Sequence, residues 1–400
     1  MGKKWDYDVP DIKVWKECLR ITKPGGTALI FAGSRTQHRM ACAVEDAGFI
    51  LKDCIMWLYG SGFPKATDIS KQLDKGHKRK VVGKQRLGGN ACIPCKEKGG
   101  TYGVGVGTIP PQDIDITEPA TPEAKLWNGW KSHGLKPAYE PIIVAMKPND
   151  GTYANNALKH GVSGLNIDGG RVGVDDNEKE SFAKEWDREQ SDKQSKTSTY
   201  LAPKEQKKDL NEFRPQGRFP ANIILDEEAG KMLDEQSGET KTNPMGNNND
   251  AQSTGCFGVG SVTEKAQRAD KGGASRFFYV AKASKSERNM GCEELPIKQT
   301  IGGGGTNNTE DDVCGKYGSI KSEGHNFHPT VKPLKLMEYL CILTKTPTGG
   351  IVLDPFVGSG TTCMACKRTG RPFIGIEQDK EYCKIAEARI KAVQVDNKLF

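Results

Sequence analysis

A strand, a glycine-rich turn and a helix follow one another in "IVLDPFVGSGTTCMACKRTG", close to the end of this 400-residue chain. In α/β domains such a turn usually follows the first strand, so most of the sheet lies behind it in sequence. Here very little chain remains after the turn. The rest of the sheet therefore has to come from earlier residues, and this requirement limits the possible folds more than any other feature.

Both ends of the chain carry the regular patterns of an α/β fold. The N-terminal pattern predicts helix, strand, helix and strand at residues 11–22, 27–33, 35–47 and 49–59. The C-terminal pattern predicts helix, strand, helix, strand and helix at 332–344, 349–356, 361–370, 372–379 and 379–393. We predict an α/β fold with a Rossmann-like, parallel-type sheet assembled from both chain ends. Residues 1–60 and 321–400 would be its two halves.

Residues 61–320 differ in composition and would form a large irregular insertion. They are rich in Gly, Asn, Lys, Asp and Pro, with short apolar islands at 140–148, 163–172, 218–225 and 275–284. The stretches 178–210 and 240–255 are polar enough to be mobile loops. Such zones usually carry recognition rather than a deep core.

Positive charge is concentrated at the start of this insertion. Residues 65–98 contain ten Lys and Arg against three Asp and Glu, a surplus equal to the +7 of the whole chain. A patch of this kind suits a polyanion, although a solvated lysine-rich surface would look the same. The residues we select as candidate DNA contacts are Lys65, Lys71, Lys78, Arg79, Lys80, Lys84 and Arg86.

Composition excludes several other classes of protein. The mean hydropathy is −0.61, and no apolar run approaches the roughly 20 residues of a membrane span. The start has no apolar stretch behind its lysines, so we expect a cytoplasmic protein with reduced thiols. Cys363 and Cys366 fit the core face of a helix. Cys92 and Cys95 resemble half a zinc knuckle without a second half, so we predict no metal site.

The glycine turn itself predicts a nucleoside ligand. Gly358 and Gly360 allow a ligand close to the backbone at a helix N-terminus. No Gly-Lys-Ser/Thr and no complete GxGxxG is present, which argues against a triphosphate or a dinucleotide. Glu377 ends the next strand, where a carboxylate accepts hydrogen bonds from ribose hydroxyls. An ordinary strand-end acid is the alternative for Glu377.

These residues resemble one known family. "DPFVGSGTT" with "FIGIEQD", preceded by "HPTVKPLKLMEYL", looks like the permuted (beta-class) amino-group DNA methyltransferases of phages and prophages. "LKPAYEPIIVAMKP", "GRFPANIIL" and "SRFFYVAKAS" are similar to the middle region of such enzymes. The resemblance implies S-adenosylmethionine (SAM) as cofactor, and 61–320 would contain the target-recognition region. The cofactor-binding residues would be Asp354, Pro355, Phe356, Gly358, Gly360, Thr361, Glu377, Thr330 and Lys332.

By the resemblance, Asp354, Phe356 and the two glycines line the methionine end of the cofactor. Glu377 holds the ribose, and Thr330 and Lys332 approach the methionine carboxylate. The substrate would be double-stranded DNA in a bacterial host cell. The reaction would methylate adenine N6 or cytosine N4 of a flipped base, with a possible companion nuclease of a restriction–modification system.

One departure from the family affects catalysis. The family's [Asp/Asn/Ser]-Pro-Pro-[Tyr/Phe/Trp] motif is absent, and the only Pro-Pro is Pro110-Pro111, with Ile before it and Gln after it. We expect the motif, with its strand, upstream of Met1. Three explanations stay open: a truncated chain, a complementing N-terminal fragment on another polypeptide, or a degenerate remnant.

Two other functions compete with methyl transfer. The chain could hold DNA or cofactor without turnover, which the missing motif favours, or act on a small molecule or RNA.

A few further residues could belong to the site. Arg35, His38 and Arg39 follow a predicted strand end and could face the cofactor or the target base, with solvated polar residues as the alternative. Trp5 and Tyr7 could flank the flipped base, with plain packing as the alternative.

Overall fold

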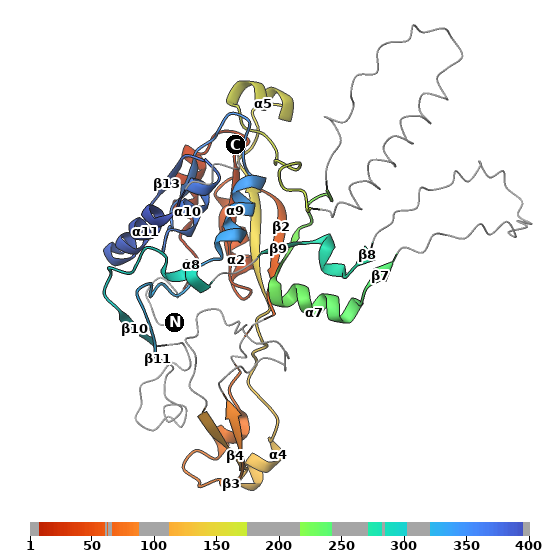
Figure 1. Ribbon diagram of the computed structural model, residues 1–400, viewed down its shortest axis with the longest axis vertical. Coiled ribbons are helices and arrows are strands. Elements are labelled where there is room, and N and C mark those ends of the chain that lie inside the picture. The colour runs from red at the N-terminus through yellow and green to blue at the C-terminus, as the bar shows by residue number, and fades with distance from the viewer. Residues whose placement is uncertain are drawn as a thin grey trace, which may run out of the picture.

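The computed structural model describes residues 8–60, 62, 66–87, 112–173, 217–241, 271–281, 285–301 and 321–394. At its centre lies a five-stranded sheet in the order β1-β5-β2-β6-β9 (Figure 1). The strands are β1 (Thr27–Phe31), β5 (Tyr139–Met146), β2 (Ile50–Leu58), β6 (Ile223–Asp226) and β9 (Tyr279–Ala281). β5 runs antiparallel to β1 and β2, whereas β6 is parallel to β2 and to β9. The predicted α/β class is confirmed, with a mixed sheet to which the middle zone contributes three strands.

The C-terminal strands form a second sheet. β12 (Val352–Asp354) and β13 (Phe373–Gly375) pair in parallel, surrounded in sequence by α9 (Leu334–Leu343), α10 (Thr361–Arg368) and α11 (Lys380–Ala392). Among the strands that the structure describes, none pairs with the outer edge of β1. No described strand lies between β1 and β12 to link the two sheets by hydrogen bonds. The two chain ends therefore meet through packing rather than through one continuous ladder.

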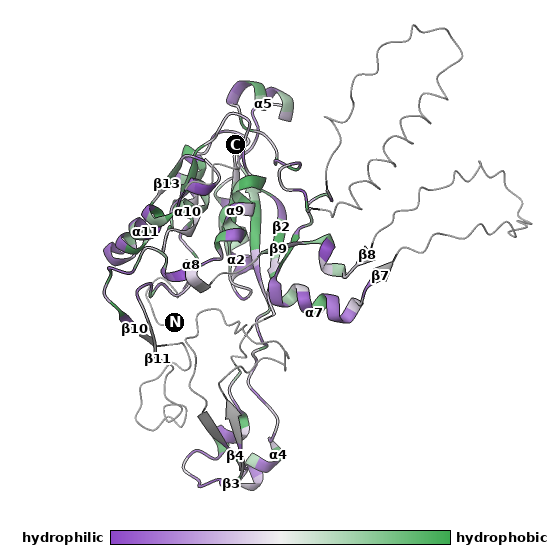
Figure 2. Cartoon of the chain, in the orientation of Figure 1, coloured by the Kyte–Doolittle hydropathy of each residue, from purple (hydrophilic) through white to green (hydrophobic). Residues whose placement is uncertain are grey.

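One hydrophobic core joins the two sheets. Ile142 and Ile224 of the large sheet pack with Leu336 of α9 and Met364 of α10, and all four side chains are fully buried. Val352 of β12 is partly buried against the same cluster. Figure 2 shows the hydrophobic residues gathered on the central strands and α9. Each fully buried side chain of this size stabilises the fold by about 1.5–3 kcal/mol relative to exposure.

The opposite face of the sheet is covered by the N-terminal helices. α1 (Ile12–Ile21) is capped by Asp11, and it packs with α2 (Gln37–Asp46) against β1 and β5. Alternate residues of β5 thus point into different cores, Ile142 into the first and Ile143 into this one. A strand buried on both faces needs a continuous apolar run, which explains "PIIVAM".

A small module stands apart from this α/β body. It consists of α3 (Ile69–Leu73), β3 (Lys80–Leu87), β4 (Gln112–Glu118) and α4 (Pro122–Leu126), and Figure 1 shows it below the sheet. We call residues 66–87 and 112–136 the hairpin module. β3 and β4 pair antiparallel with a bulge between Val81 and Gly83. The sequence pattern did not predict this pair.

The remaining elements are short and lie around the sheets. They are α5 (Tyr153–His160), α7 (Glu227–Ser237), α8 (Lys285–Asn289), the 3-10 helix Ala274–Phe277, β7 (Thr240–Lys241), β8 (Lys271–Gly272), β10 (Lys298–Ile301) and β11 (Lys321–Gly324). No helix in the described ranges is both long and apolar enough to cross a membrane. The loop predicted at 178–210 lies outside the described residues, and so does the loop predicted at 240–255 except for its first two residues.

Candidate cofactor site

The glycine turn is fixed by hydrogen bonds at both of its ends. Asp354 closes β12, and its Oδ1 accepts a hydrogen bond from Phe356 N at 3.0 Å. Gly358 and Gly360 follow with φ of +54° and +82°, and Gly360 caps α10. The first N–H groups of a helix have no intrahelical acceptor, so the turn presents donors to a ligand.

Neighbouring atoms leave no room for side chains at these glycines. A Cβ on Gly360 would lie 2.9 Å from Cα of Ala386 in α11. A Cβ on Gly358 would lie 2.7 Å from Nε2 of His328, in the segment that precedes α9. The turn is therefore held between α11 and the His328 ring, and only glycine fits both its dihedral angles and its packing.

Glu377 connects the turn to the next strand end. Its Oε2 accepts a hydrogen bond from Gly358 N at 2.8 Å, and its Oε1 accepts one from Asp379 N at 2.9 Å. Each oxygen keeps a further lone pair for another donor. The structure thus brings Asp354, Gly358 and Glu377 together at the end of β12.

Exposed apolar side chains lie close to these carboxylates in sequence. Phe356, Ile374 and Ile376 are each about half exposed, at 52%, 53% and 51%. Exposed apolar side chains near two carboxylates and backbone donors suit a ligand with a flat ring and polar substituents.

A buried cation supports the turn from behind. Arg389 of α11 is fully buried, and its Nη1 donates to Ser359 O at 2.6 Å, Ser359 Oγ at 3.0 Å and Thr361 Oγ1 at 3.0 Å. Its Nη2 donates to Glu287 O at 3.0 Å. Burial lowers the pKa of Arg389 to about 10, so the side chain stays charged at neutral pH.

Arg389 was not among the predicted site residues, although the sequence contains a signal for it. Tyr382, Ile385 and Ala386 form the buried face of α11, and Arg389 continues the same i, i+3, i+4, i+7 series. A charged residue on an apolar stripe indicates a buried polar partner. The hydroxyl of Thr361, a residue predicted to bind cofactor, is one such partner, and Thr361 is 5% exposed.

The segment before α9 lies between the turn and the large sheet. His328 contacts the turn, whereas Lys332 pairs with Glu140 Oε2 at 2.6 Å and lies over the ring of Phe31. Glu140 and Phe31 lie at the carboxyl end of β1, so the turn is at that edge of the sheet. Trp15 confirms this placement, since its ring centroid is 6.2 Å from that of Phe356.

Other predicted residues lie around this edge. Thr330 is exposed and Pro355 is half-buried. Arg35, His38 and Arg39 are exposed beyond the end of β1. Trp5 and Tyr7 lie outside the described residues.

The predicted DNA contacts occupy different environments in the hairpin module. Lys71, Lys78, Lys80 and Lys84 are exposed. Arg79 points inward and pairs with Asp74, and its side chain is 14% exposed. Arg86 lies in β3 opposite Asp113, and Lys65 is outside the described residues.

No metal site is visible in the described part of the chain, where no three His, Cys, Asp or Glu side chains gather. Cys92 and Cys95 lie outside it. Cys363 and Cys366 are 1% and 0% exposed, which confirms their predicted place in the core.

Comparison with known proteins gives a family and some partial relatives. The family model described as DNA methylase (N6_N4_Mtase) matches residues 6–388. The Type II methyltransferase M2.DpnII of Streptococcus pneumoniae is 54% identical over 70 residues, 18% of this chain and 26% of that protein. M2.LlaDCHI of Lactococcus lactis subsp. cremoris is 54% identical over 63 residues, 16% of this chain and 23% of that protein. The chain thus spans about a quarter of the length of these curated relatives.

Solved structures are similar only at a low level. The match to the crystal structure of the M1.HpyAVI–SAM complex covers 96% of this chain and 85% of that protein's chain, with 17% identity and a TM-score of 0.31. The SAM complex of TTHA0409 from Thermus thermophilus, titled a putative DNA modification methylase, covers 96% and 76%, with 13% identity and a TM-score of 0.31.

Proposed function

The chain belongs to the DNA methylase family N6_N4_Mtase, and from this premise we propose that it serves methyl transfer from SAM to an amino nitrogen of duplex DNA. The nitrogen would be adenine N6 or cytosine N4. The observation that carries the proposal is the glycine turn at the end of β12, with the Glu377 carboxylate bonded to Gly358 N. This is the arrangement that a nucleoside cofactor requires at the carboxyl edge of an α/β sheet.

The residues at this edge fit SAM chemically. Glu377 would accept the ribose hydroxyls with its remaining lone pairs, and Phe356 and Ile374 would cover the apolar faces of the ligand. Asp354, Pro355 and the N–H groups of the turn would receive the amino-acid end, which carries both charges. When bound, SAM supplies an activated methyl group on its sulfonium sulfur.

Thr330 and Lys332 belong to the same proposed site. They lie in the segment before α9, which begins at His328 beside the turn and whose Lys332 pairs with Glu140 of β5. Because Lys332 is paired with Glu140, we propose that it orients that carboxylate and adds positive charge near the cofactor carboxylate. A direct bond to the cofactor would require the Glu140 pair to open.

We further propose that residues outside these 400 supply the catalytic tetrapeptide and its strand. The free edge of β1 supports this proposal, because none of the described strands pairs with it. The indole Nε1 of Trp15 supports it as well, because this buried donor finds no acceptor among the described residues. A strand beside β1 would satisfy exposed ladder groups and bring its end to the glycine turn.

A second candidate function is binding of cofactor or DNA without turnover. The absence of [Asp/Asn/Ser]-Pro-Pro-[Tyr/Phe/Trp] from the sequence favours it for this chain alone. The two candidates share the cofactor site and differ only in the chemical step.

Calorimetric titration of SAM into the full chain tests the cofactor site. We expect binding in the wild type, a loss of at least tenfold for Glu377→Ala, and no change for Glu387→Ala, which alters an exposed acid of α11. Wild-type protein that does not bind SAM would contradict the proposal. Methyl transfer from labelled SAM to duplex DNA, with and without a polypeptide carrying the missing tetrapeptide and strand, then separates the two candidates.

A further inference from the structure

The hairpin module is attached at the edge of the sheet that carries the glycine turn. The chain leaves β2 after Leu58 and returns at Tyr139, and these two residues are partners in the β2–β5 ladder. Lys136 Nζ donates to Gly60 O, which holds the outgoing and returning segments together. The module is therefore fixed near the site but stands outside the α/β core (Figure 1).

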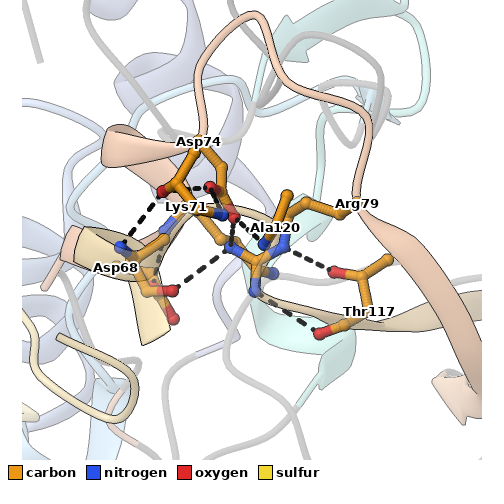
Figure 3. Close-up of polar contacts among 9 residues, drawn as sticks. Asp68, Lys71, Asp74, Arg79, Thr117 and Ala120 are labelled. Atoms are coloured by element: carbon orange, nitrogen blue, oxygen red, sulfur yellow. Dashed lines mark hydrogen bonds and ion pairs between the residues drawn. The ribbon is translucent and has the colours of Figure 1, made fainter. Parts of the chain in front are cut away.

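The interior of the module is an ion pair with a hydrogen-bond network (Figure 3). Asp74, 3% exposed, accepts hydrogen bonds from Ala120 N at 2.9 Å and from Thr121 N and Oγ1 at 3.0 and 2.8 Å. Arg79 Nη1 lies 3.1 Å from Asp74 Oδ2, and its Nε donates to Thr117 Oγ1 at 3.0 Å. Arg79 thus links α3 to β4, and its guanidinium is not available for a ligand.

The cations of β3 face acids on the neighbouring strand. The ladder sets Lys80 opposite Glu118 and Lys84 opposite Asp115. Opposite charges directly across an antiparallel pair attract and partly neutralise each other. The positive surplus counted along residues 65–98 is therefore reduced on the β3–β4 face once the fold supplies β4.

The surplus persists on α3 and the turn that follows it. Lys71, Lys75 and Lys78 are exposed, and none forms an ion pair with any described residue. The two acids of this segment are already engaged, since Asp68 caps Lys71 N at 3.0 Å and Asp74 is buried. We call Lys71, Lys75 and Lys78 the lysine face.

Two tryptophans lie beside α3, the helix that carries Lys71. Trp127 and Trp130 are 42% and 62% exposed and meet edge to face, with ring centroids 5.6 Å apart. Ile69 N, at the start of α3, donates to Trp130 O at 3.1 Å, which fixes the pair beside that helix. Large exposed aromatic rings in the same small module as unpaired cations are typical of nucleic-acid contacts.

We propose that the lysine face and the Trp127–Trp130 pair grip duplex DNA, with the lysines on phosphates and the indole rings against groove edges. This inference rests on the proposed function, because duplex DNA is the substrate proposed there. It differs from the sequence prediction in its residues. Lys75, Trp127 and Trp130 enter the contact surface, Arg79 leaves it, and Lys80 and Lys84 become secondary.

The test uses the full chain and a fluorescein-labelled duplex of mixed sequence, followed by anisotropy over a range of salt concentrations. Lys71→Gln/Lys75→Gln/Lys78→Gln should weaken binding at least tenfold and reduce the slope of log affinity against log salt by roughly three. Trp127→Ala/Trp130→Ala should weaken binding by about tenfold with little change in slope, because interface tryptophans carry much of a binding energy but no charge. The matched control, Lys13→Gln/Lys384→Gln/Lys391→Gln, removes three exposed lysines outside the module and should bind as the wild type does.

The outcomes separate this inference from the proposed function. Wild-type binding of the duplex with unchanged affinity in both module variants would overturn the inference alone. Wild-type protein that binds SAM but not the duplex, or that binds RNA more tightly, would overturn the inference and leave the cofactor site standing. Far-ultraviolet circular dichroism of each variant identifies any loss of folding. The single variants Lys75→Gln and Trp130→Phe, at exposed side chains, are then measured in place of the misfolded variant and should weaken binding in the same direction.

Discussion

Arg389 donates to both the carbonyl oxygen and the hydroxyl of Ser359, at 2.6 and 3.0 Å, from a fully buried position. A helix at the end of the chain thus fixes the conformation of the glycine turn. Removing this donor should therefore affect the fold and the ligand site together.

Arg389→Met should destabilise the protein and weaken SAM binding together. The change leaves Ser359 O and Thr361 Oγ1 buried without their charged donor, at a cost of about 2–4 kcal/mol in the free energy of unfolding. Denaturant unfolding and calorimetric titration measure the two effects. Lys391→Met, on the exposed side of the same helix, should change neither, and an unaltered SAM affinity in Arg389→Met would contradict the positioning role.

Gly360→Ala should be more damaging than an equivalent change at an uncrowded glycine. Gly349 has a φ of +72° and open space at its Cβ, whereas Gly360 has a φ of +82° and meets Ala386 Cα at 2.9 Å. Gly349→Ala should cost about 1–2 kcal/mol for the left-handed conformation alone. Crowding at Gly360 should add roughly 1–3 kcal/mol, measured by denaturant unfolding. Equal costs at both positions would show that α11 yields without penalty.

Acid should open the hairpin module through Asp74. Burial alone would raise the pKa of this carboxyl, but hydrogen bonds from Ala120 and Thr121 and the charge of Arg79 bring it below its ordinary value. A lowered folded-state pKa gives stability that is present above the unfolded pKa of about 3.9 and is lost as pH falls through the folded value.

Hydrogen exchange of the α3 and α4 amides, read by mass spectrometry, reports this opening. In wild-type protein, exchange should accelerate as pH falls below the unfolded pKa, after correction for the intrinsic rate. Asp74→Asn should exchange rapidly at neutral pH already. A corrected profile that is flat with pH in the wild type would contradict the assigned role.

Cys363 should resist alkylation in the native protein. Burial raises the pKa of its thiol to about 12, so almost no thiolate forms near neutral pH, and the side chain is 1% exposed. Peptide mapping after iodoacetamide treatment should find the exposed Cys42 modified and Cys363 intact until denaturant is added. Modification of Cys363 at the rate of Cys42 would show that the α10 core opens readily.

Local patterns predicted the regular elements of the two chain ends. The 3.6-residue spacing of Ile12, Trp15 and Leu19 predicted α1. The run that forms β5 was recognised as an apolar island but not as a strand. The place of β5 between β1 and β2 was not predictable from these signals. Periodicity reports which residues are buried, whereas strand order depends on contacts between distant segments.

The candidate site shows the same division. Glycines, Asp354 and Glu377 were recognisable because a turn and a strand end have local sequence signatures. Arg79 was assigned to a DNA surface because its partner Asp74 and the acids of β4 become neighbours only after folding. Counting charges along a chain cannot separate a paired cation from a free one.

The pairing of Leu58 with Tyr139 has a consequence for how such a chain diversifies. Residues 59–138 therefore form one connection between the paired strands β2 and β5. Lengthening such a connection costs little free energy of folding. A segment of another length or surface chemistry can replace the hairpin module at that point without moving any strand of the sheet. The rigid half of the molecule can thus remain constant while its contacts with other molecules are replaced as a block.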